Sequence, residues 1–259
     1  MGSKLGELRT IASLRWAAAL ALLALALMAA ACGGGGGDNG TAAAGATTAT
    51  GDRGEIPEPS DCTAEVDNPL VPLSSIRSKI FEGSEKDPDT GRIILTRSEQ
   101  RTLEDSETIA GYPVTAVESH GFEDGAQVDK TVAYYTQCGD GTVWFVGEKV
   151  DEIDEGEVVN SDQWEAGVDG AKAGFLMPAD PTVGQKFEPE RVPGVSETRA
   201  KIVAVGVPVK TKAGRFTGCI KTEDFSPLDE VTEFKWHCPR VGSVREQAEG
   251  LNFDLLRYS

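Results

Sequence analysis

Residues 127–147 read QVDKTVAYYTQCGDGTVWFVG, and this stretch decides the fold. Two runs rich in β-branched and aromatic residues, 127–137 and 142–147, flank the short segment CGDG. Extended strands favour those bulky residues and tight turns favour Gly and Asp, so the pattern is typical of a β-hairpin. The stretch therefore predicts two neighbouring antiparallel strands.

The same pattern continues on both sides of this hairpin. Turn-forming residues separate further runs of β-branched and apolar residues at 92–97, 196–205, 207–212, 216–222 and 231–237. No stretch after residue 58 has a long 3.6-residue period, although residues 73–81 and 165–176 could each hold a short helical turn. We expect an all-β domain with minor helix, built as a strongly curved antiparallel sheet or an incomplete β-barrel. A closed barrel and a two-sheet sandwich remain open.

Residues 160–195 differ from the strand-and-turn pattern. They are rich in Gly and Pro, yet they carry Trp164, Phe175 and Met177. A flexible linker lacks such apolar side chains, so we expect a long ordered loop that packs over one end of the sheet.

The N-terminus has the layout of an export signal. Basic Lys4, Arg9 and Arg15 precede the apolar run 16–28, and three alanines lead to Cys32. This arrangement resembles the lipobox of bacterial lipoproteins, in which the Cys is acylated and becomes the mature N-terminus. The 16 apolar residues up to residue 31 give about 24 Å of helix, short of the roughly 30 Å of a bilayer core. A spanning anchor and plain cleavage before an unmodified Cys32 are the alternatives.

These features divide the chain into three parts. Residues 1–31 are the predicted signal peptide, residues 32–58 a flexible tether of Gly, Ala and Thr, and residues 59–259 a single β-rich domain. We expect an exported protein, anchored to the outer face of the cell membrane by lipidated Cys32.

The charge of the chain excludes one class of partner. The full sequence has 25 basic and 42 acidic residues, for a net charge of −17, and loss of the signal would leave 22 against 41. A domain this acidic repels nucleic acid, so we expect none as a partner.

Cysteine usage suits an oxidising compartment. If Cys32 carries lipid, four cysteines remain, an even number for disulfides. Strand alternation puts Cys219 and Cys238 on opposite faces of neighbouring strands. Of the three connectivities we therefore favour Cys138–Cys238 with Cys62–Cys219.

Catalytic motifs are missing from the sequence. It contains no GxSxG, HExxH or GxxxxGK[ST] pattern. His120 reads as an exposed loop residue and His237 as a structural residue at a strand end. The acidic run 151–157 lacks the spacing of a calcium loop and reads as a solvated hairpin. We expect no metal and no cofactor, and an enzyme is the less favoured class.

Aromatic residues at alternating strand positions offer a possible apolar pocket. Trp144, Trp164, Met177 and Trp236 could line it, although such residues are more often plain core. If the sheet is only half closed, its concave face could take a lipid or another small apolar ligand.

Several motifs carry a resemblance that covers most of residues 67–245. The motifs at 67–72, 143–147, 164–170, 177–180, 183–185, 193–195 and 213–216 resemble those of a group of uncharacterised exported bacterial proteins. The Ala-Gly-x-Phe hairpin at 213–216 is also similar to one in curved-sheet periplasmic lipoproteins and lipid carriers. The resemblance implies fold more than function. We expect a non-catalytic domain that binds an apolar ligand or an envelope protein, with a structural module and an envelope hydrolase as alternatives.

Overall fold

The computed structural model describes residues 55–104 and 107–259. Fifteen β-strands and one short 3-10 helix, η1 (Pro59–Asp61), are found in this part of the chain. The strands are β1 (Cys62–Thr63), β2 (Ser78–Lys86), β3 (Ile93–Thr102), β4 (Glu107–Ile109), β5 (Tyr112–Glu123), β6 (Ala126–Cys138), β7 (Val143–Asp154), β8 (Glu157–Glu165), β9 (Gly174–Met177), β10 (Lys186–Val192), β11 (Ser196–Thr211), β12 (Gly214–Ser226), β13 (Val231–Cys238), β14 (Gly242–Ala248) and β15 (Leu251–Tyr258).

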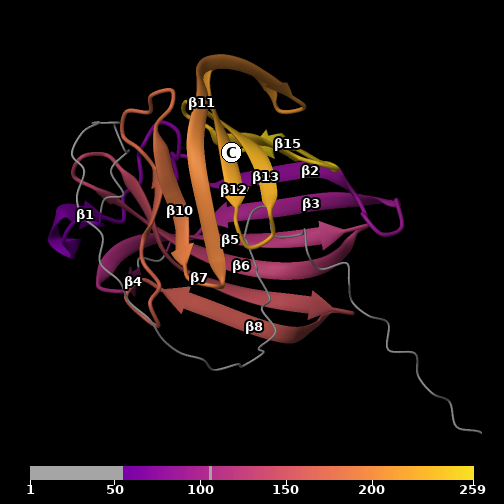
Figure 1. Cartoon of the computed structure of the whole chain (residues 1–259), viewed down its shortest axis with the longest axis horizontal. Helices are drawn as coiled ribbons and strands as arrows, with labels where there is room; N and C mark the ends of the chain where they lie inside the picture. Colours follow the sequence, from indigo (N-terminus) through magenta and orange to yellow (C-terminus); the bar gives the residue numbers. More distant parts are fainter. Residues whose placement is uncertain (1–54, 105–106) are drawn as a thin grey trace, which may run out of the picture.

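The strands form one antiparallel sheet that curls almost into a barrel (Figure 1). Its order is β10-β11-β12-β13-β14-β15-β2-β3-β5-β6-β7-β8, with β1 beside β6, β4 beside β5 and β9 beside β7. The hairpin predicted from residues 127–147 is β6–β7. The expectation of an all-β fold and an incomplete barrel is confirmed.

The barrel has one unsealed seam, between β9 and β10. In the described residues a single isolated bridge, Lys172 to Arg191, connects the two flanks, and the N–H of Lys172 donates to the carbonyl of Arg191 at 3.0 Å. Pro189 lies in β10 and has no N–H to give to a ladder. A Cβ on Gly174 would lie 1.7 Å from the carbonyl oxygen of Pro189, so the two backbones are in close contact without pairing regularly.

The long hairpin β11–β12 bends towards the neighbouring strands. Residues 196–205 and 207–212, expected as two strands, are the single strand β11 with register shifts on either side of Gly206. Gly206 and Gly218 both have φ of +72°, a conformation that glycine adopts without steric cost. The hairpin tip contacts β14 and β15, where the N–H of Ala213 donates to the carbonyl of Leu255.

Three apolar clusters stabilise the sheet. The first cluster joins residues 66–70 to β7 and to β9–β12. The second packs the tip of the β11–β12 hairpin against β2 and β13–β15. The third lies mainly on β5–β7. Ile56 packs against the third cluster, so the described chain contacts the sheet from its first residues.

The predicted disulfide pairing is wrong, although all four expected cysteines are paired. The bonds are Cys62–Cys138, between β1 and β6, and Cys219–Cys238, between β12 and β13. The error came from the aromatic residues of β13. The apolar character of Phe234 and Trp236 predicts that they face inward, but they lie on the same face as Cys219 and Lys221. The Lys221 ammonium lies over both rings.

The Gly- and Pro-rich segment 160–195 is ordered and contains strands as well as turns. It includes β9 and β10, which bring the two sides of the barrel together. Neither of the two possible helical turns forms, since residues 73–81 lead into β2 and residues 165–176 lead into β9. His120 also differs from expectation, because it lies within β5, where it pairs with Lys130 of β6.

The predicted signal peptide, Cys32 and most of the predicted tether lie outside the described residues. Within the described ranges, no helix is both long and apolar enough to cross a membrane.

Candidate functional site

A cavity of about 180 Å³ lies inside the barrel. One part of its wall is apolar and comes largely from residues 64–77, which we call the cap loop. Five cap-loop side chains face the cavity, namely Leu70, Val71, Pro72, Leu73 and Ile76. Three strand residues, Phe145, Met177 and Phe187, and Val241 in the turn between β13 and β14 complete this apolar wall.

The cap loop is held in place by hydrogen bonds of two polar side chains, the buried Asn68 and the half-buried Gln137. The Asn68 amide donates to the carbonyls of Gly141 (3.0 Å) and Pro178 (3.3 Å), and its oxygen accepts the N–H of Leu70. The Gln137 side chain accepts the N–H groups of residues 67 and 68. The loop is therefore attached to the β6–β7 turn and to the segment after β9.

The other part of the cavity wall is polar and comes mainly from β12, β13 and β14. Neighbouring residues in register point to the same side of a sheet, so Thr222, Lys235 and Glu246 form one row across the three strands. His237 and Ser243 form the next row. A register shift between Trp236 and His237 lets both Ser243 and Glu246 reach the cavity although they are three residues apart.

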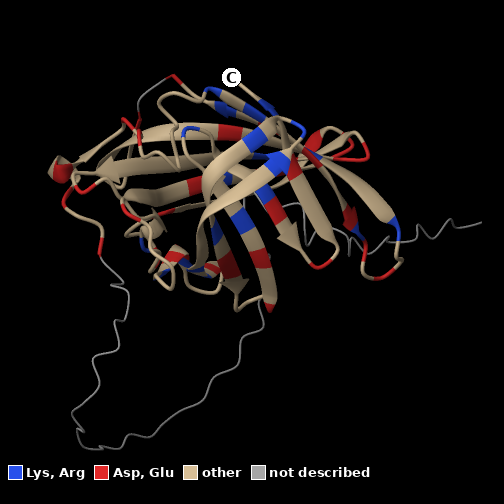
Figure 2. Ribbon diagram, turned by 90° about the horizontal axis from the view of Figure 1, so that it is seen from above, with Lys and Arg blue, Asp and Glu red and all other residues tan. Residues whose placement is uncertain are grey.

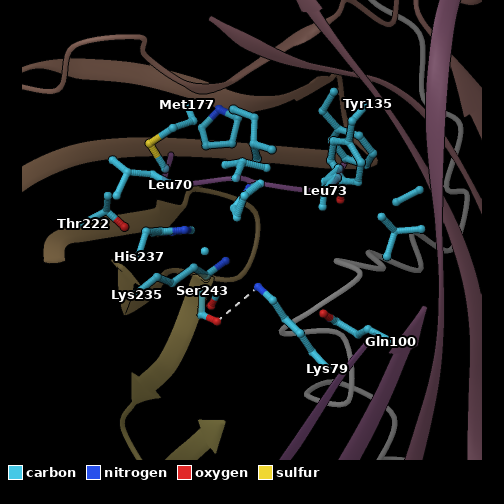
Figure 3. A pocket seen from close by; sticks show the side chains of 18 of the residues that line it. Leu70, Leu73, Lys79, Gln100, Tyr135, Met177, Thr222, Lys235, His237 and Ser243 are labelled. Atoms are coloured by element: carbon cyan, nitrogen blue, oxygen red, sulfur yellow. Dashed lines mark hydrogen bonds between the residues drawn. The ribbon is translucent and has the colours of Figure 1, made fainter. Parts of the chain in front are cut away.

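Figure 3 shows this arrangement from close by, with Lys79, Lys235, His237 and Ser243 gathered on one side and Leu70 and Leu73 on the other. Charged residues lie along the strands of the barrel as well as in its turns (Figure 2). The cavity is amphipathic, with an apolar wall under the cap loop and a charged wall opposite.

Lys235 is the centre of the ion pairs at the polar wall. Its ammonium lies 3.6 Å from the Asp224 carboxylate and 3.3 Å from that of Glu233. Burial disfavours the charged lysine, but these carboxylates outweigh burial and hold the pKa of Lys235 well above its ordinary value. Lys235 is therefore charged at neutral pH.

Lys79 enters the cavity from β2 and behaves differently. Its ammonium donates a hydrogen bond to the carbonyl of Ser243 at 3.3 Å. Burial lowers the pKa of Lys79 to about 8, with Glu246 acting in the opposite direction. Near physiological pH, Lys79 is therefore neutral in a fraction of the molecules.

Burial raises the pKa of the carboxyl groups that line the cavity. The pKa of Glu246 rises to about 8, and that of Glu148 rises well above its ordinary value because Glu190 adds repulsion to burial. The pKa values of Glu190 and Asp224 are also raised by burial. Burial, with help from Lys235 and Lys79, lowers the pKa of His237 to about 3, so its imidazole is neutral.

Several buried polar atoms at the cavity have no hydrogen-bond partner. Among the described residues nine such side-chain atoms occur, and five belong to residues that line the cavity: Thr222 Oγ1, Asp224 Oδ1, His237 Nδ1, Ser243 Oγ and Glu246 Oε2. Thr222 lies near the Asp224 carboxyl, but in the described residues no hydrogen bond of ordinary geometry joins them. Unpartnered buried polar groups are costly, so these atoms are suited to partners from a bound molecule or from water.

The structure places the four residues predicted to line a pocket in different surroundings. Met177 lines the cavity. Trp164 does not line the cavity but lies beside it, where it packs on Phe145 and is the cross-strand neighbour of Glu148. Trp144 is part of the third apolar cluster, and Trp236 shares its face with Lys221, away from the cavity.

The charged residues of the cavity were not identified from the sequence. The sequence feature that could have indicated them is the alternation in 231–238, where the charged or polar residues Glu233, Lys235 and His237 occupy every second position of the strand. The intervening aromatic residues are a stronger hydrophobic signal, and they led to the assignment of the wrong face as inward.

Within the described part of the chain, no group of three or more His, Cys, Asp or Glu side chains has an arrangement that could hold a metal ion. Comparison of the chain with protein-family models, with curated proteins and with solved structures finds no match.

Proposed function

We propose that this chain is an exported, lipid-anchored protein of the cell envelope whose β-domain binds a small amphipathic molecule in its barrel. The observation that carries the proposal is the cavity of about 180 Å³ with one apolar and one polar wall. Cavities of this kind, apolar with a few convergent polar groups, are the usual form of small-molecule sites.

Two features support the proposed location outside the cytosol. The sequence before Cys32 has the layout of an export signal with a lipid-attachment site. The structure contains two disulfides, and disulfides persist mainly in oxidising compartments outside the cytosol. The anchor would place the cavity close to the membrane, a source of amphipathic molecules.

A hydrolase is less well supported. His237 and Ser243 are cross-strand neighbours at the cavity, but within the described residues both side chains lack a hydrogen bond, so they are not joined as base and nucleophile. An imidazole with a pKa of about 3 is also a poor general base near neutral pH. The pair therefore fits binding better than catalysis.

A pair of matched variants tests the binding proposal. Val117→Phe adds a ring at a residue that lines the cavity, whereas Val132→Phe makes the same change on β6 next to Ala133, on the opposite face. The protein would be purified from its own membrane and examined by native mass spectrometry. We expect a bound mass on the wild type and on Val132→Phe, and its loss from Val117→Phe. A wild type without any bound mass, or equal retention by both variants, would contradict the proposal.

A further inference from the structure

The polar wall of the cavity indicates the chemical class of the ligand, an inference that rests on the proposed binding function. We infer that the bound molecule carries a cationic head group, such as a primary amine, which the carboxyl groups of Asp224 and Glu246 receive. Its apolar part would lie against the cap loop, where Leu70 and Leu73 face the cavity.

The first argument is the set of acceptors without donors. Asp224 is 7% exposed and Glu246 is 2% exposed, and one carboxyl oxygen of each has no partner within the described residues. Both residues line the cavity. An ammonium group carries three N–H donors and no acceptor, so it satisfies such oxygens without adding an unsatisfied group of its own.

The second argument is the charge balance of the cavity wall. Four lining residues carry carboxyl groups, namely Glu148, Glu190, Asp224 and Glu246, against the two lysines Lys79 and Lys235. Lys235 is held between Asp224 and Glu233, a further carboxylate beside the wall. Carboxyl groups therefore outnumber lysines. Burial raises the pKa values of these carboxyl groups, and an ammonium group placed against them would favour their charged form.

An anionic head group fits this wall less well. Of the two lining lysines, Lys235 is already paired with carboxylates, and one of the three N–H groups of the Lys79 ammonium donates to the carbonyl of Ser243. Burial also lowers the pKa of Lys79 to about 8, which weakens it as a permanent positive charge. A carboxylate or phosphate would in addition meet Glu246, which interacts electrostatically with Lys79.

The size of the cavity sets the size of a suitable probe. Its volume is about 180 Å³, and an engineered apolar cavity of about 150 Å³ holds benzene. By this comparison, the cavity should hold a probe molecule whose apolar chain has about six carbon atoms. Hexylamine and hexanol have apolar chains of six carbon atoms and hexanoate has one of five, and at pH 7 their head groups are cationic, neutral and anionic respectively.

The experiment compares these three probes by isothermal titration calorimetry at pH 7. The full chain would be held in phosphatidylcholine nanodiscs, and titrations into empty nanodiscs would be subtracted. Hydrogen bonds to charged groups are stronger than neutral ones, so we expect hexylamine to bind about tenfold or more tighter than hexanol. Hexanoate is expected to bind more weakly than hexanol.

Variants locate the effect at the named carboxyl groups. Glu246→Gln and Asp224→Asn should each reduce the preference for hexylamine over hexanol by about tenfold, because an amide cannot release a proton to become the carboxylate that pairs with a bound ammonium. Glu152→Gln is the matched control, since Glu152 is a buried acid with an unpartnered oxygen that does not line the cavity. It should keep the wild-type preference. Thermal melting followed by circular dichroism would verify that each variant folds.

The possible outcomes separate the two proposals. If hexanol or hexanoate binds as tightly as hexylamine, the cationic ligand is excluded while the binding function stands. If none of the three probes binds, the binding function itself fails. The comparison of probes on the wild type needs no variant, so a variant that does not fold leaves the test intact.

Discussion

Cys219 on β12 lies directly opposite Cys238 on β13, and the two sulfurs form a disulfide. The neighbouring pair Ile220 and His237 sets this register, and Ile220 and His237 point to the other side, towards the interior. The bond therefore ties together, from the opposite face, the two strands that carry Asp224 and Lys235.

The two disulfides should differ in their contribution to stability. On the chain-entropy model the closed loop of 19 residues contributes about 3 kcal/mol and that of 76 residues about 4.5 kcal/mol. We expect Cys62→Ala with Cys138→Ala to lower the free energy of unfolding more than Cys219→Ala with Cys238→Ala. Urea denaturation would measure the difference, and non-reducing peptide mapping would identify the pairs. Peptides that join Cys138 to Cys238 would contradict the structure.

The charge of Lys235 should matter far more than that of Lys221 on the opposite face of the same strand pair. Lys235→Met removes the partner of the Asp224 and Glu233 carboxylates, and breaking a buried pair costs about 3–5 kcal/mol. Lys221→Met removes only a contact of the ammonium with the rings of Phe234 and Trp236, worth about 0.5–1 kcal/mol. Urea denaturation at pH 7 compares the two, and equal losses would show that the Lys235 pair is not buried as described.

The stability of the domain should fall as the pH rises from about 6.5 to 8. Glu246 has a folded-state pKa of about 8 against an ordinary value of 4.5, so in this range the folded protein binds more protons than the unfolded chain. Each such group lowers the free energy of unfolding by up to about 1.4 kcal/mol per pH unit. Glu85 and Asp129, whose pKa values are raised to about 7 chiefly by burial, act in the same direction up to that pH.

Glu246→Gln should reduce this pH dependence, because glutamine does not titrate. Urea denaturation at pH 5, 6.5 and 8 would give the slope for the wild type and the variant. Glu157→Gln, at an exposed position of β8, is the control and should keep the wild-type slope. Lys79, whose pKa is lowered to about 8, has the opposite effect above pH 8. In that range the unfolded chain binds more protons at this lysine, so the free energy of unfolding rises with pH. An unchanged slope in Glu246→Gln would refute a buried, protonated Glu246.

Asn68 should control the order of the cap loop. Asn68→Asp removes the amide donor to the carbonyls of Gly141 and Pro178 and puts a carboxyl group in a buried site. We expect a loss of about 2–4 kcal/mol in the free energy of unfolding. Hydrogen exchange of the amides of residues 69–76 should become faster. Asn252→Asp makes the same change at an exposed position of β15 and should leave the exchange of these amides as it is.

Cys32 should determine attachment to the membrane. With radiolabelled palmitate, we expect incorporation into the wild-type chain and none into Cys32→Ser. Edman sequencing or mass spectrometry of the processed protein should place its N-terminus at residue 32. Equal incorporation in the variant, or a full-length chain with residue 1 intact, would contradict the lipoprotein proposal.

The sheet itself was predictable from the sequence because its local signals agree. β-branched and aromatic runs such as 127–137 and 142–147 alternate with Gly- and Asp-containing turns, and these predict strands and hairpins wherever the periodicity is regular. Gly206 predicts a boundary between two strands, because glycine is common in turns, whereas in the structure it lies at a bulge within the single strand β11. Strand partners far apart in the sequence, such as β15 and β2, have no local signal.

The polar wall of the cavity could not be predicted because both faces of β12 and β13 carry charged residues. Lys221 and Glu223 alternate with Thr222 and Asp224, so periodicity alone does not distinguish inside from outside. Phe234 and Trp236 suggest that their face of β13 points inward, but Lys221 covers both rings on the face away from the cavity. Only the closure of the sheet brings residues of β2, β7 and β10 to the same space as β12–β14.

Because the seam between β9 and β10 is not closed by a strand ladder, the circumference of the barrel is not fixed. A fully closed barrel has a radius fixed by its strand number and stagger, because every strand is paired on both sides. Here widening along one line would break two hydrogen bonds, from the Lys172 N–H to the carbonyl of Arg191 and from the Arg191 guanidinium to the carbonyl of Ala173. It would also separate the rings of Phe175 and Phe187, whose centroids are 5.7 Å apart. Phe187 and Met177 flank this line and also face the cavity, so widening would enlarge the interior directly. Under the binding function proposed above, such widening would admit molecules longer than the present cavity while every strand ladder stays paired.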